Sequence, residues 1–161
     1  MRSSITKRLA LIAMIPATLL VVVAFASSAQ AAVTGSAKLP GDIAALTNQQ
    51  RAAHGCKAVV VSPALTRAAA GHSAYQARTK TMSHTGSAGS TFVARAKAAG
   101  YNRPLSENVA YGYSSASAVV GAWMKSPGHR ANILNCKAIA VGVAVAYATD
   151  GTPYFTQEFG Y

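Results

Sequence analysis

The groups able to do acid–base or ligand chemistry are few in this chain, which holds four acids and four histidines among 161 residues. His84 and His129 fall at predicted helix ends or in loops, where side chains converge on clefts. Glu107 lies in the apolar stretch 105–110, where an unpaired carboxylate is costly to bury, so we expect it to have a partner. Two histidines and a glutamate suit Zn²⁺, and they equally suit acid–base catalysis.

The remaining acids and histidines have simpler interpretations. Asp42 is placed to start a helix and Asp150 to form a hairpin turn. His72 falls on the inward face of a predicted helix, which indicates a core histidine, and His54 places a favourable charge near a helix C-terminus. Glu158 lies on the final predicted strand, and we expect it at the surface; the alternative is a role in the site, if its face of the strand meets the cleft.

The first 31 residues have the pattern of a secretory signal peptide. Three basic residues precede the apolar run 9–26, and the small residues Ala29 and Ala31 form a cleavage site. A membrane anchor is the alternative, because 18 apolar residues could just span a bilayer, but Pro16 interrupts the run. We therefore expect cleavage after Ala31, secretion, and no membrane span in the mature protein.

Net charge limits the class of partner. Cleavage after Ala31 leaves 12 basic residues against four acids, a formal charge of +8. The cations are spread along the chain without interleaved aromatic residues, which argues against a nucleic-acid-binding protein. Such a surface attracts anionic lipid head groups, wall polymers or acidic polysaccharides, although simple solubility is an equal explanation.

The mature chain has two cysteines, Cys56 and Cys136. In an exported protein we expect them to form one disulfide; free thiols or zinc ligands are the alternative, and no CxxC pair supports zinc. In the chain-entropy description, a loop of this length makes the disulfide worth on the order of 4 kcal/mol.

The elements that must position these groups begin with helices. Residues 32–39 are small and polar and predict a flexible lead-in to a single domain over residues 40–161. Capping signals predict a helix from Asp42 to Gly55 and another from Ser62-Pro63 to about Lys80. Apolar spacing predicts three more helical segments, over residues 90–99, 117–125 and 129–134.

Strands dominate the C-terminal part. Residues 140–147 alternate valine or tyrosine with alanine or glycine, and a turn at 149–152 leads to a return strand over 153–161. Residues 59–61 and 108–110 are candidates for two further strands. The alanine and glycine face would let a helix approach closely. Helices followed by a hairpin predict an α+β fold with helices covering the sheet.

Eight short motifs together resemble one family, the CAP superfamily (cysteine-rich secretory proteins, antigen 5 and pathogenesis-related 1 proteins; SCP domain), in its bacterial secreted branch. Their order and spacing match along essentially the whole mature chain. In sequence order the motifs are Asn48-x-x-Arg51, Leu65-x-x-Ala68-Ala69-x-x-His72-Ser73, Met82-Ser83-His84, Arg95-x-x-x-x-Gly100-Tyr101, Glu107-Asn108-Val109-Ala110-x-Gly112, Trp123-Met124-x-Ser126-Pro127-Gly128-His129-Arg130-x-Asn132-Ile133-Leu134, Val141-Gly142-Val143 and Thr156-Gln157-x-Phe159-Gly160.

The resemblance implies a three-layer α-β-α sandwich with a central antiparallel sheet. It also implies a cleft lined by His84, His129 and Glu107, in which family members often hold a divalent cation. The eukaryotic pattern has a second glutamate after the tryptophan of the fourth helix, where this chain has Met124 and Lys125. The four-residue cluster is thereby reduced to three.

Three functions fit these observations. The first is a secreted, monomeric, non-enzymatic binding module that takes a divalent cation at His84, Glu107 and His129 and contacts lipid, sterol or an anionic envelope component. The second is a hydrolase with Glu107 as base and the histidines as metal ligands or acid–base groups. In the third, the same residues form a buried hydrogen-bonded network with a structural role only.

Overall fold

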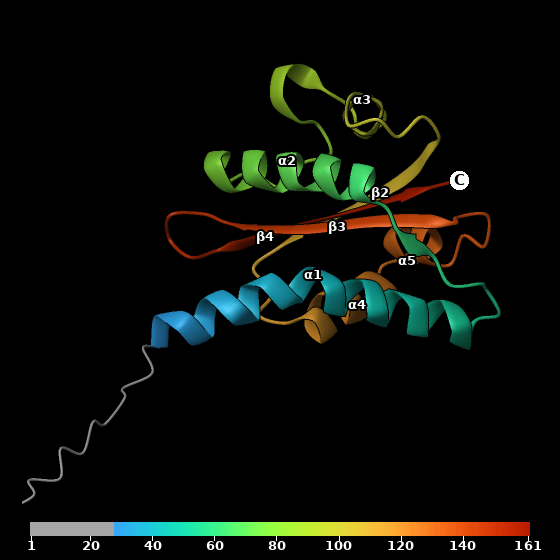
Figure 1. Cartoon of the computed structure of the whole chain (residues 1–161), viewed down its shortest axis with the longest axis horizontal. Helices are drawn as coiled ribbons and strands as arrows, with labels where there is room; N and C mark the ends of the chain where they lie inside the picture. The colour runs from blue at the N-terminus through green and yellow to red at the C-terminus, as the bar shows by residue number, and fades with distance from the viewer. Residues whose placement is uncertain (1–27) are drawn as a thin grey trace, which may run out of the picture.

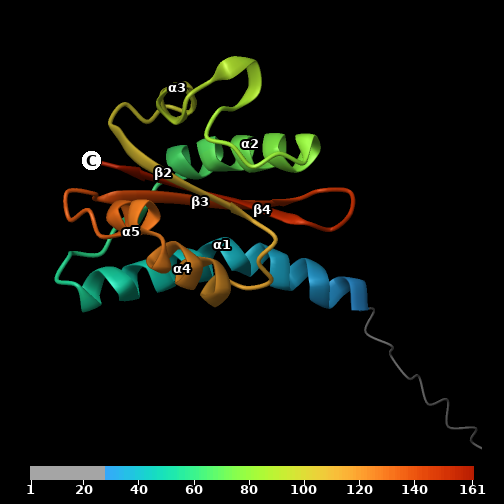
Figure 2. The same ribbon diagram turned by 180° about the vertical axis from the view of Figure 1, so that it is seen from behind.

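A computed structural model describes residues 28–161, so the predicted signal peptide lies outside the described residues except for its last four. Helices cover both faces of one sheet: α2 and α3 lie on one side, and α1 and α4 lie on the other (Figure 1; seen from behind in Figure 2). The elements are α1 (Ser28–Ala53), β1 (Val60–Val61), α2 (Pro63–Thr79), the 3₁₀ turn η1 (Ser87–Gly89), α3 (Phe92–Ala98), β2 (Pro104–Tyr111), α4 (Ala116–Lys125), α5 (Pro127–Ile133), β3 (Ala140–Tyr147) and β4 (Pro153–Gly160). The predicted three-layer sandwich is confirmed.

The sheet has the order β1-β3-β4-β2. Strand β4 pairs antiparallel with both β3 and β2, as expected, whereas the two-residue strand β1 pairs parallel with β3. The predicted antiparallel sheet therefore carries one parallel strand at its edge. The chain between β1 and β3 crosses over through helices and β2, which is the long connection that a parallel pair requires.

Helix α1 differs most from its prediction. It begins at Ser28 rather than at Asp42, so residues 32–39 are helical and not a flexible lead-in. The segment is rich in alanine, the best helix former, and Pro40 inside it removes only one backbone donor. Ile43 and Ala44 bury the following turn in the core. Asp42 is therefore an exposed residue within the helix and does not start it.

The other predicted boundaries agree with the structure within two residues, except that β2 begins at Pro104, four residues before the predicted strand over 108–110. Ser62 caps α2 by accepting the backbone N–H of Leu65 at 3.4 Å, and Lys80 ends that helix in the left-handed conformation with φ of 52°. The β3–β4 turn forms as predicted, because the Asp150 carboxylate accepts the backbone N–H of Thr152 at 3.0 Å. These local signals act within a few residues, which is why sequence alone identifies them.

The two faces of the sheet have different compositions. Valines of β3 and the phenylalanines of β4 face α1 and α4 and form the main core. The opposite face is thin at Gly142, where α2 crosses. A β-carbon at Gly142 would lie 2.1 Å from the carbonyl carbon of Leu65 and 2.3 Å from the backbone nitrogen of Thr66. The predicted close approach of a helix to this face is confirmed.

Replacing Gly142 by alanine is expected to lower the free energy of unfolding by about 2 kcal/mol, because the added methyl group must displace the backbone of α2. Denaturant unfolding monitored by circular dichroism measures the change. The matched control is Gly121→Ala in α4, where a β-carbon meets nothing within 4 Å and alanine should stabilise the helix slightly. Equal effects of the two substitutions would contradict the close packing.

Candidate functional site

Two glutamates face each other across the sheet. Glu107 of β2 and Glu158 of β4 are direct partners in the antiparallel register, so their side chains extend from the same face of the sheet. Both residues are buried, with exposed fractions of 4% and 0%. This is the face that carries α2 and α3, and two carboxyl groups so close together need compensating charge.

Glu107 has two direct partners. Its Oε1 accepts a hydrogen bond from His84 Nδ1 at 2.8 Å, and its Oε2 accepts one from Arg95 Nη2 at 2.5 Å. His72 Nε2 lies 3.9 Å from the same Oε2. The expectation that Glu107 must be paired is confirmed, and one of its partners is Arg95, which the sequence analysis named only as part of a motif.

Arg95 connects Glu107 to the loop that precedes α3; together with His84 and Glu158 these residues form the glutamate cluster. Its Nη1 donates to the carbonyl oxygens of Ser90 at 2.7 Å and of His84 at 3.2 Å, while its Nε lies 4.0 Å from Glu158 Oε1. The side chain is only 11% exposed. In the sequence Arg95 is one cation among many on a predicted helix, and only the tertiary fold shows that it points to the glutamates.

The surface position predicted for Glu158 is wrong. The residue is fully buried because the helical layer of α2 and α3 covers its face of β4. Neither carboxyl oxygen has a hydrogen-bond partner among residues 28–161. Burial, and next the neighbouring Glu107, raise the pKa of Glu158 to about 8. This carboxyl group is therefore mainly protonated at neutral pH.

The histidines differ in environment. The side chain of His84 is 60% exposed, and its hydrogen bond to Glu107 raises its pKa. His72 is buried as predicted for a core histidine; its Nε2 donates to the carbonyl oxygen of Ser83 at 2.7 Å, and burial lowers its pKa. His72 is thus a neutral neighbour of the cluster.

His129 is separate from the Glu107 carboxylate. It makes no ion pair with either glutamate in the described part of the chain, and its backbone carbonyl accepts a hydrogen bond from Asn108 Nδ2 at 3.3 Å. Its side chain lines a hollow of about 230 Å³ beside Met82, Tyr111 and Trp123. Burial, and next the charge of His84, lower the pKa of His129. The structure therefore brings His84 and Glu107 into contact but not His129.

The donor set does not fit a divalent cation in this arrangement. Between residues 28 and 161, no three His, Cys, Asp or Glu side chains form a group that could hold a metal ion. One oxygen of Glu107 is engaged by His84 and the other by the positive guanidinium of Arg95. A second cation at this carboxylate would meet Arg95 at short range.

On the face of the sheet covered by α1, amide side chains connect the strands and helices that carry site residues. Asn108 Nδ2 donates to Gln157 Oε1 at 3.0 Å, and Gln157 Nε2 donates to Thr47 Oγ1 at 2.8 Å, which links β2 to β4 and to α1. Asn132 Nδ2 donates to Asn108 Oδ1 at 2.8 Å and so attaches α5. Every link is buried or half-buried, and each fixes an element that carries a site residue.

The outer edge of β2 is covered by side chains from α4 and α5. Trp123 Nε1 donates to the carbonyl oxygen of Val109 at 3.2 Å, and Asn132 Nδ2 donates to that of Glu107 at 3.1 Å. These bonds satisfy carbonyl groups that an edge strand would otherwise leave open. Two positions of the long tryptophan motif, Trp123 and Asn132, therefore hold the strand of Glu107 in place.

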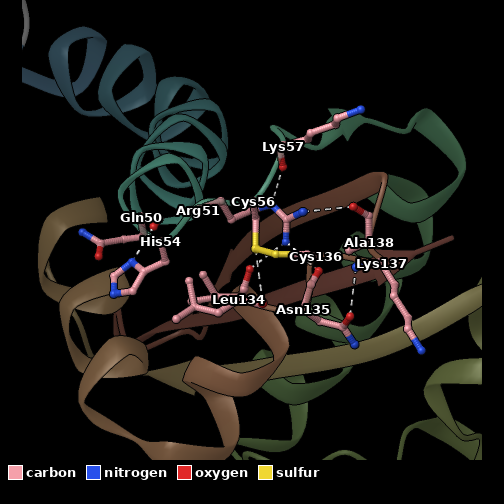
Figure 3. The surroundings of a disulfide bond; sticks show 11 residues. Gln50, Arg51, His54, Cys56, Lys57, Leu134, Asn135, Cys136, Lys137 and Ala138 are labelled. Atoms are coloured by element: carbon pink, nitrogen blue, oxygen red, sulfur yellow. Dashed lines mark hydrogen bonds between the residues drawn. A yellow bond between two sulfur atoms is a disulfide. The ribbon is translucent and has the colours of Figure 1, made fainter.

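The disulfide between Cys56 and Cys136 forms as predicted. Beside it lies Arg51, fully buried, which donates to four backbone carbonyls: Lys57 at 3.0 Å, Ile133 at 2.8 Å, Asn135 at 2.9 Å and Ala138 at 3.0 Å (Figure 3). Burial lowers the pKa of this guanidinium. The arginine and the disulfide together tie the end of α1 to the loop after α5.

A model of the cysteine-rich secretory protein family, CAP, matches residues 44–159. No curated protein sequence matches the chain. Among solved structures, an extracellular protein containing an SCP domain from Bacillus anthracis is 27% identical, with a TM-score of 0.70 over 78% of this chain. The chain spans 41% of the length of that Bacillus protein.

Two more solved structures share the fold. An outer surface protein from Borrelia burgdorferi is 22% identical, with a TM-score of 0.67 over 73% of this chain and 88% of its own. A cysteine-rich secretory protein from Staphylococcus aureus is 20% identical, with a TM-score of 0.62 over 80% of this chain and 40% of its own. The three bacterial structures agree with the layers described above.

Proposed function

The chain belongs to the cysteine-rich secretory protein family, CAP, and we propose that it acts outside the cell as a non-enzymatic binding module for an anionic component of the cell envelope. The Bacillus and Borrelia proteins, described as extracellular and as an outer surface protein, support this location. The expected signal peptide would supply the export route. No helix in residues 28–161 is long and apolar enough to cross a membrane.

The distribution of charge between interior and surface carries the proposal. The two glutamates are buried beside Arg95, so the exposed acids of residues 38–161 are Asp42 and Asp150 only. Ten cations of that range are exposed: Lys38, Lys57, Arg67, Arg78, Lys80, Lys97, Arg103, Lys125, Arg130 and Lys137. The surface thus carries nearly the whole net positive charge, which favours anionic partners over a long range.

One surface hollow combines this charge with apolar side chains. Lys125 and Arg130 line it together with Met124 and Leu134, between α4 and α5, around a volume of about 360 Å³. Basic heads beside apolar side chains suit a lipid with an anionic head group. We place the envelope contact at this hollow, with sterols and acidic wall polymers as competing ligands in the test.

The secreted protein is expected to sediment with vesicles containing phosphatidylglycerol and to stay in solution with pure phosphatidylcholine. Binding should fall about tenfold between about 0.1 and 1 M salt, where the screening length drops from roughly 10 to 3 Å. The double variant Lys125→Ala/Arg130→Ala should bind more weakly than the charge-matched control Lys38→Ala/Lys97→Ala. Equal loss of binding in both variants would show that the contact does not lie at the hollow of Lys125 and Arg130. Binding that is independent of salt, or absent with every anionic ligand, would refute the proposed function.

A hydrolase is the second candidate, supported by one contact. The hydrogen bond between Glu107 and His84 Nδ1 orients an exposed imidazole whose other nitrogen, Nε2, has no hydrogen-bond partner within residues 28–161 and could take a proton from water. Peptide and ester turnover that is lost in His84→Gln but kept in His54→Gln would establish this activity. Turnover unchanged in the His84 variant would exclude it.

A further inference from the structure

We propose that the guanidinium of Arg95 supplies the positive charge beside Glu107 and Glu158 that a divalent cation would otherwise supply, and that it occupies the position such a cation would need. The wild-type cluster is therefore complete without a metal. This inference concerns the interior of the protein and does not rest on the envelope contact proposed above.

Arg95 is hydrogen-bonded to one of the two carboxyl groups and lies near the other without a hydrogen bond to it. Its Nη2 binds Glu107 Oε2 at 2.5 Å, and its Nε lies 4.0 Å from Glu158 Oε1. The two carboxyl groups belong to neighbouring strands and face each other in register. One guanidinium from α3 thus lies close to both carboxyl groups, as a metal ion bound by two carboxylates would.

The surrounding loop closes the position around the guanidinium. Arg95 Nη1 donates to the carbonyl oxygens of Ser90 and His84. A β-carbon at Gly86 would lie 2.9 Å from Arg95 Nη1 and 3.1 Å from His72 Nδ1, so the backbone of this loop packs directly on the site. An arginine held by a carboxylate and two carbonyls has little freedom to leave, and its positive charge opposes a second cation.

The balance of charge agrees with this assignment. Arg95 already places one positive charge beside the two glutamates, through its ion pair with Glu107 and its position 4.0 Å from Glu158 Oε1. A divalent ion would add two more positive charges at short range from this buried guanidinium, at high electrostatic cost. Removing Arg95 reverses the situation, because two facing carboxyl groups would then lack a cation and His84 would remain beside them.

As placed in the wild type, Glu107, Glu158 and His84 do not form a group that could hold a metal ion. Arg95→Met frees these three side chains to turn toward one another, and we expect the variant to acquire a metal site made of them. Oxygen and imidazole ligands of this kind suit Zn²⁺ and its spectroscopic substitute Co²⁺. The untagged wild-type protein should show no saturable calorimetric binding of Zn²⁺ at the cluster and no change in melting temperature with Zn²⁺ or chelator. Arg95→Met should melt lower than wild type, regain stability with Zn²⁺, and give a visible Co²⁺ absorption band.

Two controls identify the site. Arg67→Met removes an exposed arginine, which donates to the carbonyl oxygen of Ala99, and should acquire no metal binding. Adding Glu158→Gln to Arg95→Met should abolish the acquired binding. Saturable Zn²⁺ binding by the wild type that is lost in His84→Ala would overturn the proposal, and this titration decides it even if Arg95→Met does not fold. A folded Arg95→Met protein without acquired binding would also overturn it.

Discussion

Replacing Arg51 by alanine is expected to cost about 4 kcal/mol of the free energy of unfolding. The fully buried guanidinium donates to four backbone carbonyls, two of them in buried and two in part-buried hydrogen bonds. Each buried acceptor left unpaired costs roughly 1–3 kcal/mol, which exceeds the gain from no longer burying the charge. The loop that carries Cys136 and the end of α5 should loosen first.

Denaturant unfolding of the disulfide-intact protein, followed by tryptophan fluorescence and circular dichroism, measures this loss. The matched control is Arg67→Ala, which removes an exposed arginine with a single hydrogen bond to Ala99 and should change stability by less than about 0.5 kcal/mol. If both variants lose a similar, small amount of unfolding free energy, the hydrogen bonds of Arg51 are not the main stabilising contacts of this region. Arg51→Lys should recover little, since an ammonium group cannot match the planar fork of donors.

Replacing Glu158 by glutamine is expected to stabilise the protein at pH 8 by on the order of 4 kcal/mol and to have no effect at pH 4. The folded pKa of Glu158 is about 8, above the ordinary value of 4.5, so the folded state holds a proton that the unfolded state releases between these values. Stability therefore falls as pH rises through this window, by about 1.4 kcal/mol per unit for this group. Glutamine imitates the protonated acid and removes the dependence.

Unfolding free energies measured from pH 4 to 9 for both proteins isolate this contribution by difference. His84 also has a raised pKa and adds a stability that is lost with rising pH, whereas the lowered pKa values of His72 and His129 act in the opposite direction below the ordinary histidine range. These contributions cancel if the substitution leaves them unchanged. Asp42→Asn, an exposed acid on α1, should leave the profile as it is. Parallel curves for wild type and Glu158→Gln would contradict the raised pKa.

These expectations change the meaning of the family motifs in this chain. Trp123 and Asn132 donate hydrogen bonds to the edge of β2, and Asn108 and Gln157 link three elements below the sheet. Glu107 is held by His84 and Arg95. Much of the motif set therefore maintains the position of two strands, in line with the structural alternative, while the cationic surface is free to bind a partner.

Local signals in the sequence predicted much of the fold. The Ser62-Pro63 start, the Asp150 turn and the alternation of β3 specify their elements within a few residues, and the resemblance to the family supplied the layers. The start of α1 was missed because Pro40 and Asp42 together resemble the start of a helix. In the structure the helix continues across both residues, which alanine-rich sequence before them and burial of Ile43 after them favour. No local signal distinguishes these two cases.

The candidate site was predicted only in part. Glu107 was expected to need a partner, and His84 provides one. The contacts of Arg95, which was named only as part of a motif, and the burial of Glu158, whose site role was only an alternative, were not predicted. Nothing near them in sequence indicates burial: one is a cation on a short helix, and the other alternates with apolar residues like any exposed strand residue. The metal role of His84, Glu107 and His129 stays a prediction, which the wild-type titration tests.

By itself the sequence determined most of the elements, the disulfide and the need of Glu107 for a partner, because these follow from local periodicity, capping, cysteine count and the cost of burying charge. It indicated the family through the resemblance of its motifs. Only the tertiary structure decided which charges meet. The pairing of β2 with β4 sets Glu107 against Glu158, and the packing of α3 brings Arg95 to both. Electrostatic energy depends on distance in space, and residues 95, 107 and 158 become neighbours only when the sheet and its helices assemble.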